Sequence, residues 1–113
     1  MTDMRNVSRD TLFLLDPDWA DPAYGGERHF YCKECMIVEG LLATFPERAA
    51  NIDIVRVAWP RPRAAVVEAI GEENQNLPAL VWAEEDGSAG FANDIEALLA
   101  ALATRHGFPE RHP

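Results

Sequence analysis

The stretch Phe30-Tyr31-Cys32-Lys33-Glu34-Cys35 holds the only two cysteines of the 113-residue chain. It opens a run in which apolar residues recur every three or four positions as far as Phe45, with Pro46 as its stop. This spacing predicts a largely buried helix that begins at Cys32. The two thiols then lie one turn apart at a helix N-terminus, where they can close a disulfide.

A short strand and a long loop are expected before this helix. Residues 11–15 form an almost continuously apolar run that ends at Asp16-Pro17, which predicts a buried strand. Residues 16–31 hold two prolines, two glycines and four acidic residues, and they are predicted to be loop. The aromatic residues of this loop either line a pocket or fix the loop onto the core, and they are Trp19, Tyr24 and Phe30.

The sequence after the helix predicts five further elements in the order strand, helix, strand, strand and helix. They are the strand 52–59, the helix 64–70, the strands 79–83 and 89–92, and the helix 95–106. Residues 52–59 carry apolar side chains on both faces, which predicts a strand that is covered on both sides. Asn93 or Asp94 is expected to cap the last helix, and Gly107 to end it.

The resulting order is β-α-β-α-β-β-α, with a core that covers residues 11–106. A right-handed crossover makes the first two strands parallel, and a hairpin makes the last two antiparallel. We therefore expect an α/β fold with a four-stranded mixed sheet and helices on both faces. A chain of 113 residues is expected to form a single domain, residues 1–113.

Charge and hydropathy limit the partners that this protein can have. Nineteen acidic and ten basic residues give a net charge of -9, which argues against binding to nucleic acid or to an anionic membrane. The longest apolar run, residues 97–103, has seven residues, whereas a membrane span needs about 20. The apolar stretch of residues 11–15 is too short for the core of a signal peptide, so we expect none. We expect a cytoplasmic protein, in which a structural disulfide would be unusual.

The cysteine pair carries the most specific chemical signal of the sequence. The N–H groups and dipole of the helix N-terminus, together with Lys33, favour a thiolate on Cys32, whereas Glu34 opposes it. This predicts Cys32 as a nucleophile and Cys35 as the resolving thiol. Asp16, at the end of the first strand, is the expected base for Cys35. The alternative is that both cysteines only pack in the core.

At two motifs the sequence resembles the thioredoxin-like superfamily. Residues 31–35 lie where that superfamily carries an aromatic-CxxC motif, and Leu77-Pro78 lies where it carries a cis-proline before its third core strand. A narrower resemblance, to a bacterial thioredoxin-fold family of unassigned function, rests on residues 30–32, 58–63, 76–78 and 105–109. The resemblance implies a thioredoxin-like topology in which Pro78 presents its backbone to the substrate. The dipeptide Lys33-Glu34 and the long preceding loop depart from the thioredoxins, glutaredoxins and disulfide isomerases.

Several segments are expected to meet at the sheet edge that carries the cysteines. The residues expected to bind substrate there are Tyr31, Lys33, Trp59, Arg61, Arg63, Leu77, Pro78, Asn93 and Asp94. Lys33 and the two arginines would form a cationic rim, unless residues 60–63 are only a stiff, solvated loop. The resemblance implies that Asn93-Asp94 meets a carboxylate of glutathione, and a helix N-terminus binds anions on physical grounds as well.

A zinc site is the weaker alternative for the cysteines. His29, Cys32 and Cys35 form an H-x2-C-x2-C group that would hold zinc if His106 or His112 supplied a fourth ligand. A second cysteine pair, usual in structural zinc sites, is missing from the sequence. We therefore expect no metal.

Two functional hypotheses follow from the sequence. The first is a thiol-disulfide oxidoreductase or redox sensor without a resident cofactor, which acts on a thiol or a disulfide, including that of another protein. Glutathione is its candidate co-substrate. The second is a non-catalytic thioredoxin-fold module that binds a partner, or forms a homodimer, through residues 16–31 and Trp59-Pro60.

Overall fold

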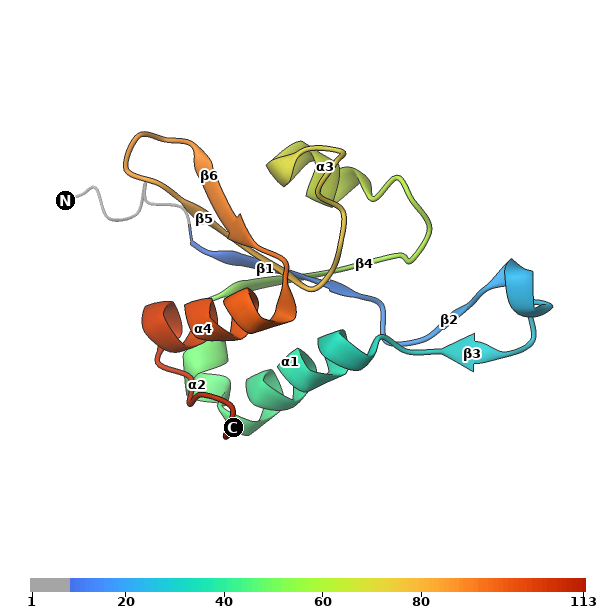
Figure 1. Cartoon of the computed structure of the whole chain (residues 1–113), viewed down its shortest axis with the longest axis horizontal. Coiled ribbons are helices and arrows are strands. Elements are labelled where there is room, and N and C mark those ends of the chain that lie inside the picture. Colours follow the sequence, from blue (N-terminus) through green and yellow to red (C-terminus); the bar gives the residue numbers. More distant parts are fainter. Residues whose placement is uncertain (1–8) are drawn as a thin grey trace.

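A four-stranded mixed sheet organises the structure, a computed structural model that describes residues 9–113 (Figure 1). Strand β1 (Thr11–Leu15) lies between β4 (Asp53–Val57), its parallel neighbour, and β5 (Ala79–Ala83), its antiparallel neighbour. Strand β6 (Ala89–Ala92) pairs antiparallel with β5 and completes the order β4-β1-β5-β6. The predicted α/β class, the parallel first pair and the antiparallel hairpin are therefore confirmed.

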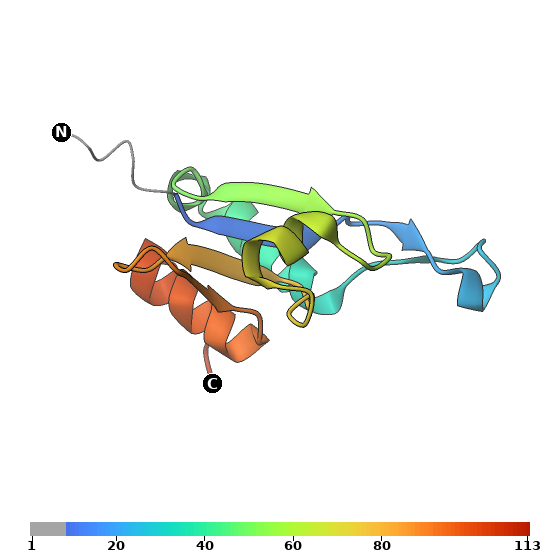
Figure 2. The same ribbon diagram turned by 90° about the horizontal axis from the view of Figure 1, so that it is seen from above.

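Four helices cover the sheet. They are α1 (Lys33–Thr44), α2 (Pro46–Ala49), α3 (Ala64–Ile70) and α4 (Ile95–His106). Helices α1 and α4 lie on one face of the sheet, and α3 lies on the other (Figures 1 and 2). The central strand β1 is therefore buried on both sides: Leu12 and Leu14 have no exposed surface, and Phe13 and Leu15 are 6% exposed.

The core lies mainly between the sheet and the two helices α1 and α4, which cover one of its faces. Val38 and Leu42 of α1 and Leu98 and Leu102 of α4 are buried against it. Beyond α4, Phe108 is buried as well, and its ring meets that of Phe45 edge-on at a centroid distance of 6.2 Å. Near the start of α1, the Cys35 sulfur accepts a hydrogen bond from the N–H of Leu15 at 3.5 Å, which places this part of the helix at the end of β1.

Residues 16–31 are more ordered than the predicted loop. They contain strands β2 (Trp19–Ala20) and β3 (His29–Phe30), which pair antiparallel, and a 3-10 helix, η2 (Pro22–Tyr24). The Asp21 carboxylate accepts a hydrogen bond from the N–H of Ala23 at 2.9 Å and caps η2, and Gly25 ends η2 with a φ of 89°. Residues 19–30 form an arm that projects from the sheet (Figures 1 and 2).

Two predicted boundaries differ from the observed ones. Pro46, expected only to stop a helix, also begins α2, because proline fits the first position of a helix, where no N–H is needed. The strand predicted over residues 52–59 is limited to Asp53–Val57, because β1 offers only five partners. Trp59 consequently lies in the loop after β4. Over residues 9–113, no helix combines the length and the apolar character that a membrane span requires.

Candidate active site

Cys32 caps the N-terminus of α1. Its backbone is extended, with φ -90° and ψ 118°, and its Sγ accepts a hydrogen bond from the N–H of Cys35 at 3.1 Å. Serine or aspartate usually makes this capping bond. The half-buried sulfur therefore lies at the positive end of the helix, in contact with a donor that favours negative charge on it.

Cys35 is in a different environment. Its side chain has no exposed surface, and its Sγ accepts a hydrogen bond from the N–H of Leu15 at 3.5 Å. The pKa of Cys35 is raised to about 12: burial is the largest cause, Cys32 and the charge of Glu39 also raise it, and the bond from Leu15 lowers it. Both cysteines are free thiols, so the structure holds a reduced pair in which the second thiol stays protonated at neutral pH.

Glu39 is the carboxylate whose charge contributes to the raised pKa of Cys35. Glu39 lies one helical turn after Cys35 and accepts two hydrogen bonds from the Arg56 guanidinium of β4, at 2.8 Å and 2.7 Å. Those bonds raise the pKa of Arg56, and the charge of Asp16 raises it as well. The sequence signal that would have found Glu39 is its i, i+4 spacing from Cys35 on the helix.

A cavity of about 380 Å³ lies beside the cysteine motif. It is formed by the start of α1, the loops before α3 and β5, and the start of α4. Its lining residues are Glu34, Arg61, Arg63, Asn76, Leu77, Asn93, Asp94 and Ile95. The structure thus brings together five of the residues expected to bind substrate, from three separate segments, next to a residue of the motif.

Arg63 does not belong to a cationic rim. It is 7% exposed, and its guanidinium donates hydrogen bonds to the carbonyl of Trp59 at 2.9 Å and 2.7 Å and to the carbonyl of Gln75 at 2.7 Å. Its backbone N–H donates to the side-chain oxygen of Gln75 at 2.7 Å. The expectation of a rim arginine was wrong here, because Trp59 and Gln75 supply the acceptors that allow this side chain to be buried.

The other residues expected at the rim have different positions. Arg61 is exposed and donates to the side-chain oxygen of Asn76 at 2.9 Å, so it is the cation at the mouth of the cavity. Lys33 and Tyr31 are exposed and do not line the cavity. The peptide bond between Leu77 and Pro78 is cis, and Pro78 is fully buried at the start of β5.

Asp94, and not Asn93, caps the last helix. Its carboxylate accepts a hydrogen bond from the N–H of Ala97 at 3.2 Å. Asn93 is half-buried, and its polar side chain lines the cavity. With Glu34 on the opposite side, the cavity combines two guanidinium groups with two carboxylates, so its charges are mixed.

Trp59 links this region to the arm. Its ring stacks on that of Trp19, with the centroids 6.2 Å apart and the planes inclined by 9°. Further out, Tyr24 and Phe30 contact each other at 5.3 Å, and the Arg28 guanidinium lies 5.5 Å and 5.2 Å from their ring centres. The loop aromatics therefore pack within the arm and at its base, and none of them lines the cavity beside the cysteines.

Two histidines considered as zinc ligands, His29 and His106, each interact with a carboxylate instead. His29 pairs with Asp18 in the arm, and His106 contacts Asp10 at 2.8 Å at the other end of β1. Within residues 9–113, no three His, Cys, Asp or Glu side chains are grouped so that they could share a metal ion. The zinc alternative thus has no site in the part of the chain that the structure describes.

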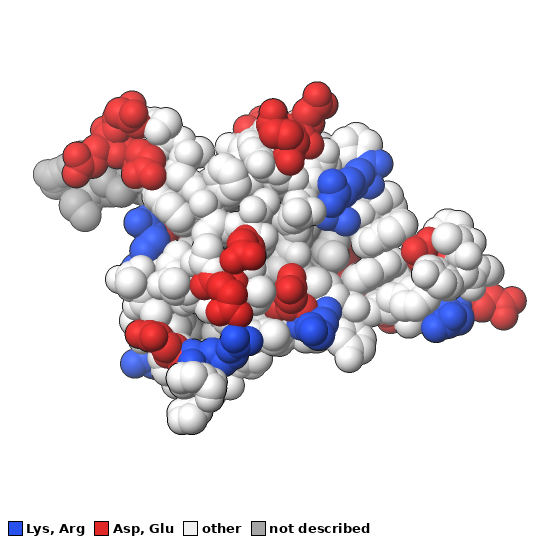
Figure 3. All heavy atoms as spheres, viewed as in Figure 1, with Lys and Arg blue, Asp and Glu red and all other residues white. Residues whose placement is uncertain are grey.

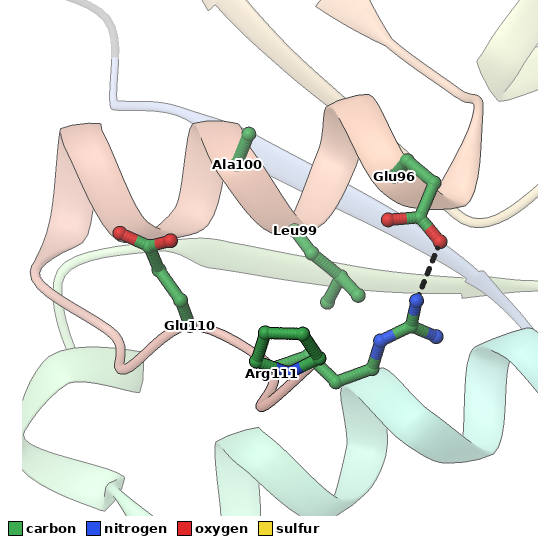
Figure 4. A pocket seen from close by; sticks show the side chains of 6 residues that line it. Glu96, Leu99, Ala100, Glu110 and Arg111 are labelled. Atoms are coloured by element: carbon green, nitrogen blue, oxygen red, sulfur yellow. Dashed lines mark hydrogen bonds and ion pairs between the residues drawn. The ribbon is translucent and has the colours of Figure 1, made fainter.

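A second cavity, of about 260 Å³, lies between α4 and the C-terminal segment (Figure 4). Arg111 spans its mouth and donates to Glu96 at 2.9 Å. Both side chains of this ion pair are more than half exposed, so the pair contributes little stability. No residue of the cysteine motif lines this cavity. The cavity beside the cysteines is therefore the better candidate site.

The charged side chains of the surface are interspersed. On the face seen in Figure 3, lysines and arginines form small separate groups among acidic side chains. This distribution fits the net charge of -9. A ligand with negative charge would have to be attracted by local groups such as Arg61, because the field of the whole molecule opposes it.

One family includes this chain. The sequence model described as "Protein of unknown function (DUF3088)" matches residues 9–110, and the chain therefore belongs to that family. The match covers every strand and helix of the structure, both cysteines and the whole cavity beside them. No curated protein and no solved structure matches the chain.

Proposed function

We propose that this member of the DUF3088 family is a thioredoxin-like thiol-disulfide oxidoreductase, or a redox sensor of the same chemistry. The observation that carries the proposal is the asymmetry of the two thiols. Cys32 is half-buried and receives an N–H donor at the start of α1, whereas Cys35 is buried with a pKa raised to about 12. A pair that attacks and then resolves a disulfide needs this difference.

The arrangement of the sheet supports the thioredoxin-like part of the proposal. Its order is β4-β1-β5-β6, with β1 and β4 parallel and β5 and β6 antiparallel. The cysteine motif follows β1 through the arm, and the cis bond before Pro78 leads into β5. These are the places that the resemblance implies for both motifs.

In the first step, the Cys32 thiolate attacks one sulfur of a disulfide. The substrate S–S bond breaks, a mixed disulfide forms on Cys32, and one thiolate leaves and takes a proton from water. The N–H of Cys35, at 3.1 Å from the Cys32 sulfur, favours the ionised form of the attacking group.

In the second step, Cys35 loses its proton and its sulfur attacks the Cys32 sulfur. The mixed disulfide bond breaks, and the second substrate sulfur leaves as a thiolate and takes up a proton. The substrate has then gained two electrons and two protons, and the pair is oxidised to a Cys32–Cys35 disulfide. In the mixed disulfide Cys32 is no longer ionised, so one of the charges that raise the pKa of Cys35 disappears, and burial and Glu39 remain. A low-molecular-weight thiol or a protein dithiol then returns two electrons and restores the reduced pair.

The cavity beside the motif supplies groups for a small anionic thiol. The exposed guanidinium of Arg61 and the polar side chain of Asn93 are placed for a carboxylate, and the start of α4 adds its positive end. Glutathione is the co-substrate that fits this chemistry best. A reducing, cytoplasmic compartment is proposed together with it, since glutathione keeps thiols reduced there.

A turnover assay tests the oxidoreductase. Reduction of a protein disulfide such as that of insulin should proceed with glutathione as the electron source. Cys32→Ser should abolish it, and Cys35→Ser should accumulate a mixed disulfide on Cys32 that mass spectrometry detects. Equal rates for the wild type and Cys32→Ser would rule out the catalytic function. Glu47→Gln, on the exposed surface of α2, is the control.

One observation favours the second hypothesis, a binding module or homodimer. The arm projects from the sheet, none of residues 20–29 is buried, and Tyr24 and Tyr31 are 57% and 66% exposed. Exposed aromatic side chains are typical of protein interfaces. Light scattering tests the homodimer: a dimer that dissociates in the variant Tyr24→Ala would support it, and a monomeric wild type would exclude it.

A further inference from the structure

Arg63 is a buried cation that forms no ion pair with any described residue. It is 7% exposed, yet over residues 9–113 its guanidinium forms no ion pair and bonds only to the carbonyl oxygens of Trp59 and Gln75. Carbonyl groups satisfy hydrogen bonds but carry no net charge, and burying an unpaired charge is costly. A buried, unpaired charge is therefore expected only where the charge serves a function, or where its hydrogen bonds offset the cost of burial.

Arg63 lies beside the cysteine motif, because it lines the same cavity as Glu34, the residue that directly precedes Cys35. Burial lowers the pKa of Arg63, and the charge of Arg61 lowers it further, whereas ionised Cys35 and Cys32 raise it. Coulomb interactions are mutual, so the charge that benefits from a thiolate also stabilises that thiolate. The pKa of Cys35 is raised to about 12, so the half-buried Cys32 is the thiol of the pair on which the proposed nucleophilic attack depends.

We propose that Arg63 is a positioning residue that holds a fixed positive charge behind the cysteine motif and stabilises the Cys32 thiolate. This inference rests on the proposed thiol-disulfide function. It replaces the expectation that Lys33 supplies the charge, since Lys33 is exposed and its field is screened by salt.

The guanidinium is held in place before any substrate arrives. Two bonds to the Trp59 carbonyl and one to the Gln75 carbonyl fix its plane, and a bond from its own backbone N–H to Gln75 fixes the chain behind it. A charge that is already oriented needs no reorganisation when the thiolate forms, and it is worth more in a site from which water is excluded. Arg63 also lines the cavity, so the same charge faces the site of an arriving anionic thiol.

The alkylation of Cys32 by iodoacetamide measures the thiolate directly and needs no turnover. With the alkylated cysteine identified by mass spectrometry, the rate is recorded from pH 5 to pH 10. In Arg63→Gln, the rate at pH 7 should fall roughly three- to tenfold, and the plateau at high pH should stay unchanged. Arg63→Lys should retain most of the rate, and Arg9→Gln, an exposed arginine that does not line the cavity, should change it less than twofold.

An unchanged profile in folded Arg63→Gln protein would overturn the inference. The wild type provides a second test that does not depend on the folding of a variant. If a buried charge stabilises the thiolate, the midpoint of the profile should be nearly the same in about 0.05 M and about 1 M salt. A midpoint that rises clearly with salt would assign the stabilisation to exposed cations such as Lys33, and the inference would be wrong.

These measurements separate the inference from the proposed function. A shifted alkylation profile in Arg63→Gln, combined with no disulfide turnover by the wild type, would support the role of Arg63 and refute the oxidoreductase. Normal turnover with an unshifted profile would refute the role of Arg63 and leave the oxidoreductase in place.

Discussion

The Glu39 carboxylate on α1 and the Arg56 guanidinium on β4 form a bidentate ion pair, with N–O distances of 2.8 Å and 2.7 Å. The pair joins the helix that carries the cysteines to the strand beside β1. Arg56 offsets part of the negative charge of Glu39, but this charge still contributes to the raised pKa of Cys35. The ion pair therefore connects the packing of α1 against β4 with the ionisation of Cys35.

Substitution of Glu39 should make Cys35 easier to ionise. In Glu39→Gln, a negative charge near the thiol is removed and Arg56 is left unpaired, and both changes lower the pKa of Cys35. Burial, the largest cause of the raised pKa, is unchanged. The pH profile for closure of the Cys32–Cys35 disulfide, followed by stopped-flow fluorescence, should therefore move to lower pH.

The control for this experiment is Glu47→Gln on α2. Glu47 is exposed and paired with Arg48 at 2.8 Å, and it does not contribute to the pKa of Cys35. Its variant should close the disulfide with the wild-type profile. Slower closure in Glu39→Gln at every pH would contradict the prediction and would show that Glu39 accepts the proton from Cys35.

A buried carboxylate at the start of β1 should make stability depend on acidity. The side chain of Asp10 is 8% exposed and contacts Arg105 at 2.6 Å and His106 at 2.8 Å. Burial raises the pKa of Asp10, but the bonds from these two residues outweigh it and hold the pKa below the usual 3.8. The interactions of ionised Asp10 with Arg105 and His106 thus stabilise the fold above about pH 4. This stabilisation is lost as the pH falls through the lowered pKa of Asp10.

Asp10→Asn should therefore cost about 1 to 3 kcal/mol in the free energy of unfolding at pH 7, measured by urea denaturation. The difference from the wild type should shrink when the titration is repeated below pH 3.8, the usual value of this carboxyl group. Asp53→Asn is the matched control, because Asp53 is 56% exposed and should cost less than about 1 kcal/mol. An equal cost at both pH values would show that the charge of Asp10 is not what stabilises the fold.

Most elements of the sheet and its helices could be predicted from the sequence. The strand 11–15, the hairpin strands 79–83 and 89–92, and the helices 64–70 and 95–106 lie where the patterns placed them. In these elements the apolar pattern stops where a residue that ends the element follows. Gly71 and Gly107, for example, end the helices α3 and α4. The arm could not be predicted, because strands of two residues are too short to show a period.

The candidate site could be predicted only in part. The position of the motif and the convergence of Arg61, Leu77 and Asn93 follow from the order of the strands. The burial of Arg63 does not, because Arg61 and Arg63 alternate with prolines in the same way and only one of them is buried. The difference comes from Gln75, which lies twelve positions further along the chain and supplies an acceptor for Arg63.

Substitution of two glycines by alanine should change the stability of the protein in opposite directions. Gly40 lies in the exposed part of α1, and an added Cβ would meet no atom within 4 Å, so Gly40→Ala should stabilise the protein by about 0.5 to 1 kcal/mol. Gly90 lies opposite Trp82 across β5 and β6, and its added Cβ would collide with the indole ring. Gly90→Ala should therefore destabilise the protein by about 1 to 3 kcal/mol.

Thermal unfolding of the two glycine variants checks both signs. The loss in Gly90→Ala should be accompanied by a change in tryptophan fluorescence, because the Trp82 ring must leave Glu84, to which it donates at 3.1 Å, and Arg105, which stacks on it at 4.9 Å. A Gly90→Ala protein as stable as the wild type would mean that the ring moves aside at no cost.

The outer part of the arm should be dispensable for folding. Ala20 and His29 already pair across β2 and β3, so residues 21–28 can be replaced by Asn-Gly, which favours a two-residue hairpin turn. The packing that this change removes lies within the arm, and Trp19 keeps its stacking on Trp59. The free energy of unfolding should change by less than about 0.5 kcal/mol, and the alkylation profile of Cys32 should stay the same. Trp19→Ala, which detaches the arm at its base, should cost clearly more. A shortened protein that fails to fold would show that the arm supports the core.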